Sequence, residues 1–175
     1  MPVNGGRREV HSVADRSPVE IFQQALTEHG FTSEYVATTL HGNALFEEAH
    51  PDKRRYQMRR FLSENVVRHF AFEEKNVFPA LRSSTSASIG RIVDELVAEH
   101  HTMLVQVRAL RRLLRRLNSA SHPDRWLRLE RSFRDFLRTL LGHSIREDNL
   151  LLAFKQDILL NPFGPGRPPS TPSSS

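Results

Sequence analysis

The sequence contains no cysteine. This absence excludes disulfide bonds, thiolate nucleophiles, sulfur-ligated zinc and iron–sulfur clusters. Any bound metal must therefore be held by nitrogen and oxygen atoms, and nine histidines are present to supply the nitrogen.

Long apolar runs are also missing from the 175 residues. No stretch approaches the ~20 apolar residues that a helix needs to cross a bilayer. The first residues, Met1 to Arg8, lack the apolar stretch of a secretory signal. Since 38% of the residues are hydrophobic and 26% are charged, the composition is that of one globular domain with a buried core. We therefore expect a cytoplasmic protein with no membrane partner.

The two ends of the chain differ in composition from the part between them. Residues 1–16 are polar and contain glycine, and residues 161–175 are rich in proline and serine. Such segments do not form packed elements, so we expect a flexible arm at 1–16 and a disordered tail at 161–175. One domain at 17–160 is expected between them.

Apolar residues recur at steps of three and four across this domain, which is the period of amphipathic α-helices. Capping residues, prolines and a serine cluster divide the pattern into four helices. These are expected from Ser17-Pro18 to about Ala49, from Pro51 to about Arg82, from the serines at 83–86 to about Asn118, and from Pro123 to about Leu160. Because short connections join long helices, we predict an all-α, up-down-up-down antiparallel four-helix bundle.

The sequence also repeats itself at an offset of roughly 70 positions. Glu28-His29 matches Glu99-His100, and His50-Pro51-Asp52 matches His122-Pro123-Asp124. The segment that begins at His69 likewise matches the one that begins at His143. Three matches at nearly one offset predict two related helical hairpins packed face to face.

Histidines interrupt the apolar stripe of every predicted helix, and glutamates follow two of them one turn later. The interrupting residues are His29 on the first helix, His69 and Glu73 on the second, His100 on the third, and His143 and Glu147 on the fourth. Residues four apart lie on one side of a helix, so each histidine–glutamate pair can reach one metal centre. An ionised carboxylate is costly to bury alone, so two buried glutamates require a cation. The six residues therefore predict a metal site.

Distances along the helices decide which histidines can meet. At ~1.5 Å per residue, the four interrupting histidines lie at similar height in the bundle. His41 would be offset by roughly 15 Å and turned by about 120° from His29, so we predict that it is not a ligand. The other histidines set aside are His11 in the arm, His50 and His122 before helix-starting prolines, and His101, one residue off the stripe of His100.

The pattern Glu28-His29, His69-x-x-x-Glu73, Glu99-His100 and His143-x-x-x-Glu147 resembles that of hemerythrin-like, or HHE cation-binding, domains. The run from His69 to Pro79, HFAFEEKNVFP, resembles the same family. The resemblance covers the chain from Pro18 to about Leu160.

This resemblance implies a centre of two non-haem iron ions. His29 and His69 would bind one iron, His100 and His143 would bind the other, and Glu73 and Glu147 would bridge them. The sequence departs from oxygen-carrying hemerythrins at Leu104, where those proteins have a further histidine one turn from the third-helix ligand. The departure leaves more iron positions open and disfavours a pure reversible oxygen carrier.

Three functions remain. In the first, the di-iron protein binds or senses O2, nitric oxide or a related small oxidant. In the second, it is a di-iron enzyme that consumes peroxide or activates oxygen, and the missing histidine favours turnover. In the third, a metal-free scaffold binds an anionic partner, which conflicts with the buried glutamates.

The third function would use a basic end of the bundle. This end is formed by Arg111, Arg112, Arg115 and Arg116 together with Arg125, Arg128, Arg131 and Arg134. We interpret these arginines as a solvated face and do not expect nucleic acid to bind there, because no DNA-binding motif accompanies them.

Overall fold

The structure, a computed structural model, describes residues 18–42, 50–84, 87–118 and 120–160. The arm predicted at 1–16 and the tail predicted at 161–175 lie outside these ranges. Within them the chain is all-helical and forms no strand. None of the helices in the described ranges is long and apolar enough to span a membrane.

Four long helical segments make up the described chain. They are α1 (Pro18–Gly42), a composite segment at 51–84, α5 (Ala87–Arg115) and α6 (Pro123–Leu160). The helix starts predicted at the three prolines are confirmed, because proline suits the first turn, where its missing N–H needs no partner. The part of the first predicted helix at 43–49 lies outside the described residues. The third helix is shorter than predicted, and a turn between Asn118 and Ser121 follows it.

The composite segment corrects the prediction of one uninterrupted α-helix at 51–82. It runs through α2 (Pro51–Arg60), η2 (Phe61–Val67), α3 (Arg68–Phe72), η3 (Glu73–Val77) and α4 (Phe78–Ser84), and η2 and η3 are π-helical.

Side chains bond to backbone oxygens beside these wide turns. Asn76 donates to the carbonyl of Phe72 at 2.8 Å, and Arg111 donates to the carbonyl of Leu62 at 3.4 Å. Such side-chain bonds help to satisfy backbone groups where regular α-helical bonding is disturbed. Short π-helical segments are rare and occur often at functional sites, and η3 begins at Glu73, one of the predicted site residues.

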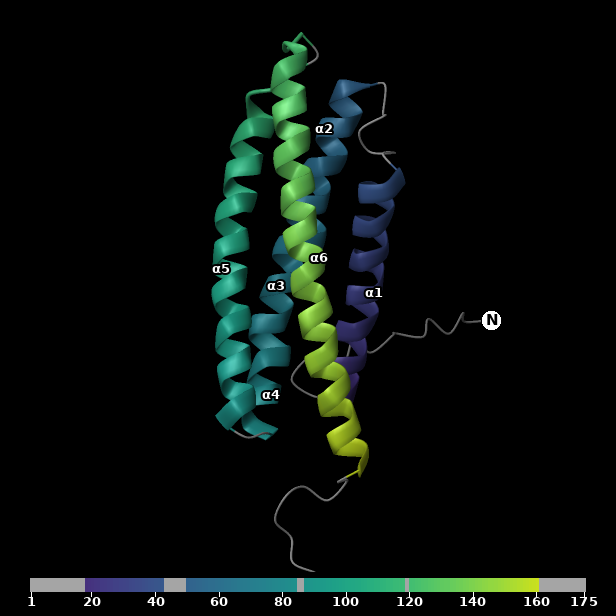
Figure 1. The fold of residues 1–175 in the computed structure, drawn as a ribbon, viewed down its shortest axis with the longest axis vertical. Helices are drawn as coiled ribbons and strands as arrows, with labels where there is room; N and C mark the ends of the chain where they lie inside the picture. The colour runs from purple at the N-terminus through teal and green to yellow at the C-terminus, as the bar shows by residue number, and fades with distance from the viewer. Residues whose placement is uncertain (1–17, 43–49, 85–86, 119, 161–175) are drawn as a thin grey trace, which may run out of the picture.

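The segments pack side by side as a bundle (Figure 1). α6 contacts both α1 and α5, while the composite segment contacts α5 through α4 and α2, and contacts α1 through η3. The predicted stripes face inward, as Phe22 on α1, Met58 on α2, Val93 on α5 and Phe136 on α6 illustrate, since each is buried.

The apolar core consists of two clusters. One contains Val36, Phe61, Phe70, Val107 and Phe133, among others, from the end of α1, the first half of the composite segment, the end of α5 and the start of α6. The other is smaller and is built from the opposite ends of the same helices. Its large members are Phe22, Phe78, Leu81, Leu96 and Phe154. The predicted site residues lie between the two clusters.

Candidate metal centre

The six predicted site residues come together between the two apolar clusters. All are buried, with exposed fractions between 0% for His29 and His100 and 5% for His69. α1 and α5 each bring one histidine, while α6 and the composite segment each bring a histidine and a glutamate one turn apart. The convergence predicted from helix heights is therefore present in the fold.

Glu73 and Glu147 stand at the middle of this group. Glu73 Oε1 lies 2.6 Å from His29 Nε2 and 3.0 Å from His69 Nε2, and Glu73 Oε2 lies 3.4 Å from His100 Nε2. Glu147 Oε1 lies 3.0 Å from His143 Nε2 and 3.4 Å from His100 Nε2. Every histidine thus turns its Nε2 atom toward a central carboxylate.

Two overlapping groups in this arrangement have the geometry to hold a cation. One is formed by His29, His69, Glu73 and Glu147, and the other by His100, His143 and Glu147. Within each group, the ligand atoms all lie within 4.8 Å of one another. Glu147 belongs to both groups, so its carboxylate lies between the two sets of donor atoms.

A second layer of carboxylates holds the Nδ1 atoms of the same histidines. His29 Nδ1 lies 2.7 Å from Asp148 and His143 Nδ1 lies 2.7 Å from Glu99. His100 Nδ1 lies 3.0 Å from Glu74, and His69 Nδ1 lies 3.5 Å from Glu28. A carboxylate on the outer nitrogen fixes the ring so that Nε2 is presented to a metal.

Sequence reasoning did not assign a role to these four outer carboxylates, although the repeat contains the signal. Glu28 and Glu99 directly precede the histidines of α1 and α5, and Glu74 and Asp148 directly follow the two central glutamates. In each hairpin, the carboxylate beside one site residue binds a histidine on another helix. The spacing fixes the site residues, whereas the cross-helix pairing depends on side-chain directions that only the packed bundle defines.

The side chains of the site also set one another's charge. Burial disfavours the charged form of His29, but hydrogen bonds to Asp148 and Glu73 outweigh it and raise the pKa of His29 to about 10. Burial likewise opposes the charge of His69, yet Glu73 and Glu28 raise the pKa of His69 to about 9. Burial opposes ionisation of Glu73, but the two imidazoles beside it lower its pKa to about 2.

The other half of the site shows the same directions. Burial opposes the charge of His143, but attraction to Glu147, Glu99 and Glu73 together outweighs it, so the pKa of His143 is raised. Burial and repulsion by Glu73 oppose ionisation of Glu147, but attraction to the nearby imidazoles of His100 and His143 outweighs both and lowers the pKa of Glu147. Protons on the imidazoles therefore balance the central carboxylates, and a metal cation would replace those protons.

Several buried polar atoms at the centre form no hydrogen bond and could instead bind a cation. Among the described residues, Nε2 of His69, His100 and His143, Oε2 of Glu73 and both carboxylate oxygens of Glu147 are buried without a hydrogen-bond partner. A buried polar atom without a partner costs ~1–3 kcal/mol. Imidazole nitrogens and carboxylate oxygens are ligands for iron, manganese and zinc. The residues present therefore suit a transition-metal centre.

The other described histidines lie away from this group. His101 is exposed beside buried His100, as its place off the stripe predicts. His50 and His122 are also exposed, and the ring of His122 accepts a hydrogen bond from the backbone N–H of Asp124 at the start of α6. The side chain of His41 and all of His11 lie outside the described part of the chain, so their exclusion stays a prediction.

The chain was compared with known families and proteins. The model of the hemerythrin HHE cation-binding domain matches residues 21–154. No curated protein and no solved structure matches the chain. The matched range begins in α1, ends in α6 and contains all six residues of the centre.

Proposed function

Because this chain belongs to the hemerythrin HHE cation-binding family, we propose that it is a non-haem di-iron protein that binds or senses O2, nitric oxide or a related small oxidant at an open iron position. The ligands in this proposal are His29, His69, Glu73, His100, His143 and Glu147. The proposal rests on one observation. Buried imidazole Nε2 atoms and carboxylate oxygens that have no hydrogen-bond partner lie close together between the two apolar clusters.

The donor set supports two metal positions, one with four candidate ligands and one with three. His29 and His69 face one position, His100 and His143 face the other, and the central glutamates lie between them. Six protein ligands cannot saturate two irons that each accept five or six donors. The irons would supply the open coordination positions at which a small ligand binds.

The protein residues perform three tasks around such a centre. The outer carboxylates orient the imidazoles, and the buried glutamates supply the negative charge that balances the cations. Apolar residues of the larger cluster, including Val66, Val107 and Leu140, would restrict the entry of water from that side.

A peroxide-consuming or oxygen-activating enzyme is the second candidate. It is favoured by Leu104, which packs against the larger apolar cluster at the place where oxygen carriers have a further histidine. A position that no protein donor fills remains available for a reacting ligand. A metal-free scaffold with a basic end is disfavoured, because Glu73 and Glu147 are 1% and 2% exposed and buried carboxylates require a balancing cation.

We further propose that the helices follow the antiparallel up-down-up-down order. Two contacts support it, since Arg55 near the start of the composite segment donates to the carbonyl of Leu117 after α5, and Arg134 near the start of α6 donates to the carbonyl of Leu40 near the end of α1. In Figure 1 the colour gradient reverses its direction along the bundle from one segment to the next.

Metal analysis combined with absorption spectroscopy tests the main proposal. Protein purified from iron-rich cells should contain about two irons per chain, and anaerobic reduction should change its near-ultraviolet absorption. Iron-replete protein that contains no metal, or contains zinc alone, would reject the di-iron proposal.

A further inference from the structure

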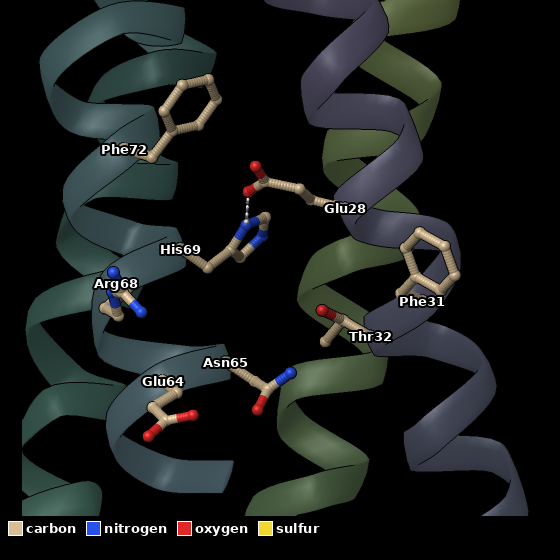
Figure 2. Close-up of a pocket in the computed structure, with 8 residues that line it drawn as sticks. All are labelled: Glu28, Phe31, Thr32, Glu64, Asn65, Arg68, His69 and Phe72. Atoms are coloured by element: carbon tan, nitrogen blue, oxygen red, sulfur yellow. Dashed lines mark hydrogen bonds and ion pairs between the residues drawn. The ribbon is translucent and has the colours of Figure 1, made fainter. Parts of the chain in front are cut away.

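A pocket of about 650 Å³ opens between α1 and the composite segment. Figure 2 shows it with Glu28, Phe31 and Thr32 on the α1 side and Asn65, Arg68 and His69 on the other. Phe72 and Glu64 complete the lining. The pocket therefore reaches one of the six residues of the proposed centre.

His69 is the part of the centre that meets this pocket. Its exposed fraction of 5% is the largest among the six. Its outer partner Glu28, which also lines the pocket, is 3.5 Å away, whereas the other three histidine–carboxylate pairs measure between 2.7 and 3.0 Å. The centre is thus least tightly enclosed where the pocket meets it.

The second hairpin, formed by α5 and α6, carries different residues at the positions that correspond to the pocket lining. Three residues after its histidine, the composite segment has Phe72, while α6 has Arg146, which forms an ion pair with Glu99. Three residues after its own histidine, α1 has Thr32, while α5 has buried Met103. The positions that correspond to Phe72 and Thr32 of the pocket are therefore occupied by an ion-paired arginine and a core methionine.

Aromatic rings also cover the other half of the centre. Phe70 stacks on His100 with ring centroids 3.9 Å apart and an interplanar angle of 12°. Phe78 lies on the same imidazole with centroids 5.4 Å apart, and the ring of Phe70 meets His143 edge-on at 5.7 Å. Access past these rings would require buried core side chains to move.

We propose that small polar molecules, of the size of hydrogen peroxide or azide, enter and leave the centre through the pocket between α1 and the composite segment. The lining suits such molecules, because Asn65 and Thr32 offer hydrogen-bonding groups and the rings of Phe31 and Phe72 form apolar parts of the lining (Figure 2). Arg68 also lines the pocket, and the described residues show no ion pair for it. This inference rests on the proposed metal centre, which the pocket would serve.

Asn65 and Thr139 provide a matched pair of test positions. Each is exposed and lies one helical turn before its histidine, Asn65 before His69 and Thr139 before His143. Asn65 lines the pocket and Thr139 occupies the corresponding place in the second hairpin. The variants Asn65→Trp and Thr139→Trp add the same bulk at related places, and Asn65→Ala removes the amide without filling the pocket.

Azide binding to the iron-loaded, oxidised protein is followed by stopped-flow absorption. We expect Asn65→Trp to reduce the association and dissociation rates of azide by at least tenfold and to leave the equilibrium constant unchanged, since a route affects both directions equally. Thr139→Trp and Asn65→Ala should bind azide at the rate of the original protein. Unchanged rates in Asn65→Trp, or equal slowing in Thr139→Trp, would overturn the assignment of the route.

A second measurement uses the apoprotein and separates the two proposals. The uptake of Co2+ is followed by its visible absorption, and all variants are first checked for unchanged helical content. If the original protein takes up no Co2+ and no iron, the metal centre itself is rejected. If it is loaded normally and azide enters Asn65→Trp without delay, the centre stands and the route is wrong. Slower Co2+ uptake by Asn65→Trp than by Thr139→Trp is the expected result.

Discussion

His29 on α1 and Asp148 on α6 join the first and last helices at the centre, with His29 Nδ1 and Asp148 Oδ1 2.7 Å apart. Asp148 lies directly after Glu147, whose carboxylate is 3.5 Å from Nε2 of the same imidazole. Two neighbouring residues of α6 therefore approach the two nitrogens of one ring on α1. This arrangement fixes the ring, and it makes the pairing of α1 with α6 part of the site.

The outer carboxylates should control metal affinity without binding metal themselves. We expect Asp148→Asn and Glu99→Gln each to weaken metal binding by about 10–100-fold, because loss of such a partner releases the orientation of a ligand histidine. Competition with a chelator measures the affinity. Asp135→Asn on α6, where Asp135 is exposed and pairs with Arg138, is the control and should bind metal normally. Equal affinities in all three variants would contradict this role.

The choice among histidines can be tested by metal content. His29→Ala should lose at least half of the bound iron, since His29 is fully buried and its Nε2 faces both central glutamates. His101→Ala and His41→Ala should retain it, and elemental analysis of the three purified variants measures the difference. Loss in His41→Ala with retention in His29→Ala would reverse the assignment on α1.

The stability gained from metal should depend on pH. The folded-state pKa values of His29 and His69 are raised to about 10 and 9, so their contribution to apoprotein stability is complete below about 6.5 and is lost as the pH rises through these values. The lowered pKa of Glu73 contributes above about 4.5 and is lost as the pH falls through about 2. The melting temperature of apoprotein should therefore fall between about pH 6.5 and 10, and the difference from loaded protein should increase by several degrees. A difference that is constant over this range would contradict protonated imidazoles in the apoprotein.

Metal loading should release protons for the same reason. Near pH 7.5 the raised pKa values keep His29 and His69 protonated in the apoprotein, whereas a ligand nitrogen must be free of its proton. We expect the release of about two protons per chain from these two histidines when anaerobic Fe2+ is added in a weakly buffered solution with a pH indicator. The Glu73→Gln variant should release fewer, because the carboxylate that raises both values is gone. Loading without proton release would show that the imidazoles are already neutral.

Reaction with a small oxidant distinguishes the candidate functions. Anaerobic, reduced protein mixed with O2 should change its spectrum rapidly and should not return fully to the reduced spectrum when O2 is removed, since Leu104 replaces the further histidine of oxygen carriers. The variant Leu104→His should make the change more reversible. Complete reversibility in the original protein would favour an oxygen carrier, and the absence of any change would leave metal storage or a structural site.

The sequence was sufficient for most of the helix bounds and for the convergence of the six central residues, whereas their role as metal ligands stays a prediction. Proline marks the starts of α1, α2 and α6, and the helical period places His29, His69, His100 and His143 at one height. These features depend on local geometry, which short-range patterns carry. The π-helical turns at η2 and η3 could not be predicted, because apolar spacing of three and four tolerates one extra residue in a turn. The pocket beside His69 depends on which side chains face each other across two helices, and no single-helix pattern contains that information.

The layer of polar residues between the two apolar clusters gives the bundle two separate hydrophobic cores on the same four helices. Each apolar cluster can be regarded as a separate unit of unfolding, and the centre between them connects the two units. With a cation in place the two units should lose their structure in one cooperative transition. With protons in its place, the smaller core around Phe22 and Phe154 should exchange its backbone hydrogens with solvent sooner than the core around Phe61 and Phe133. The bound metal would then make the two cores of the bundle unfold together.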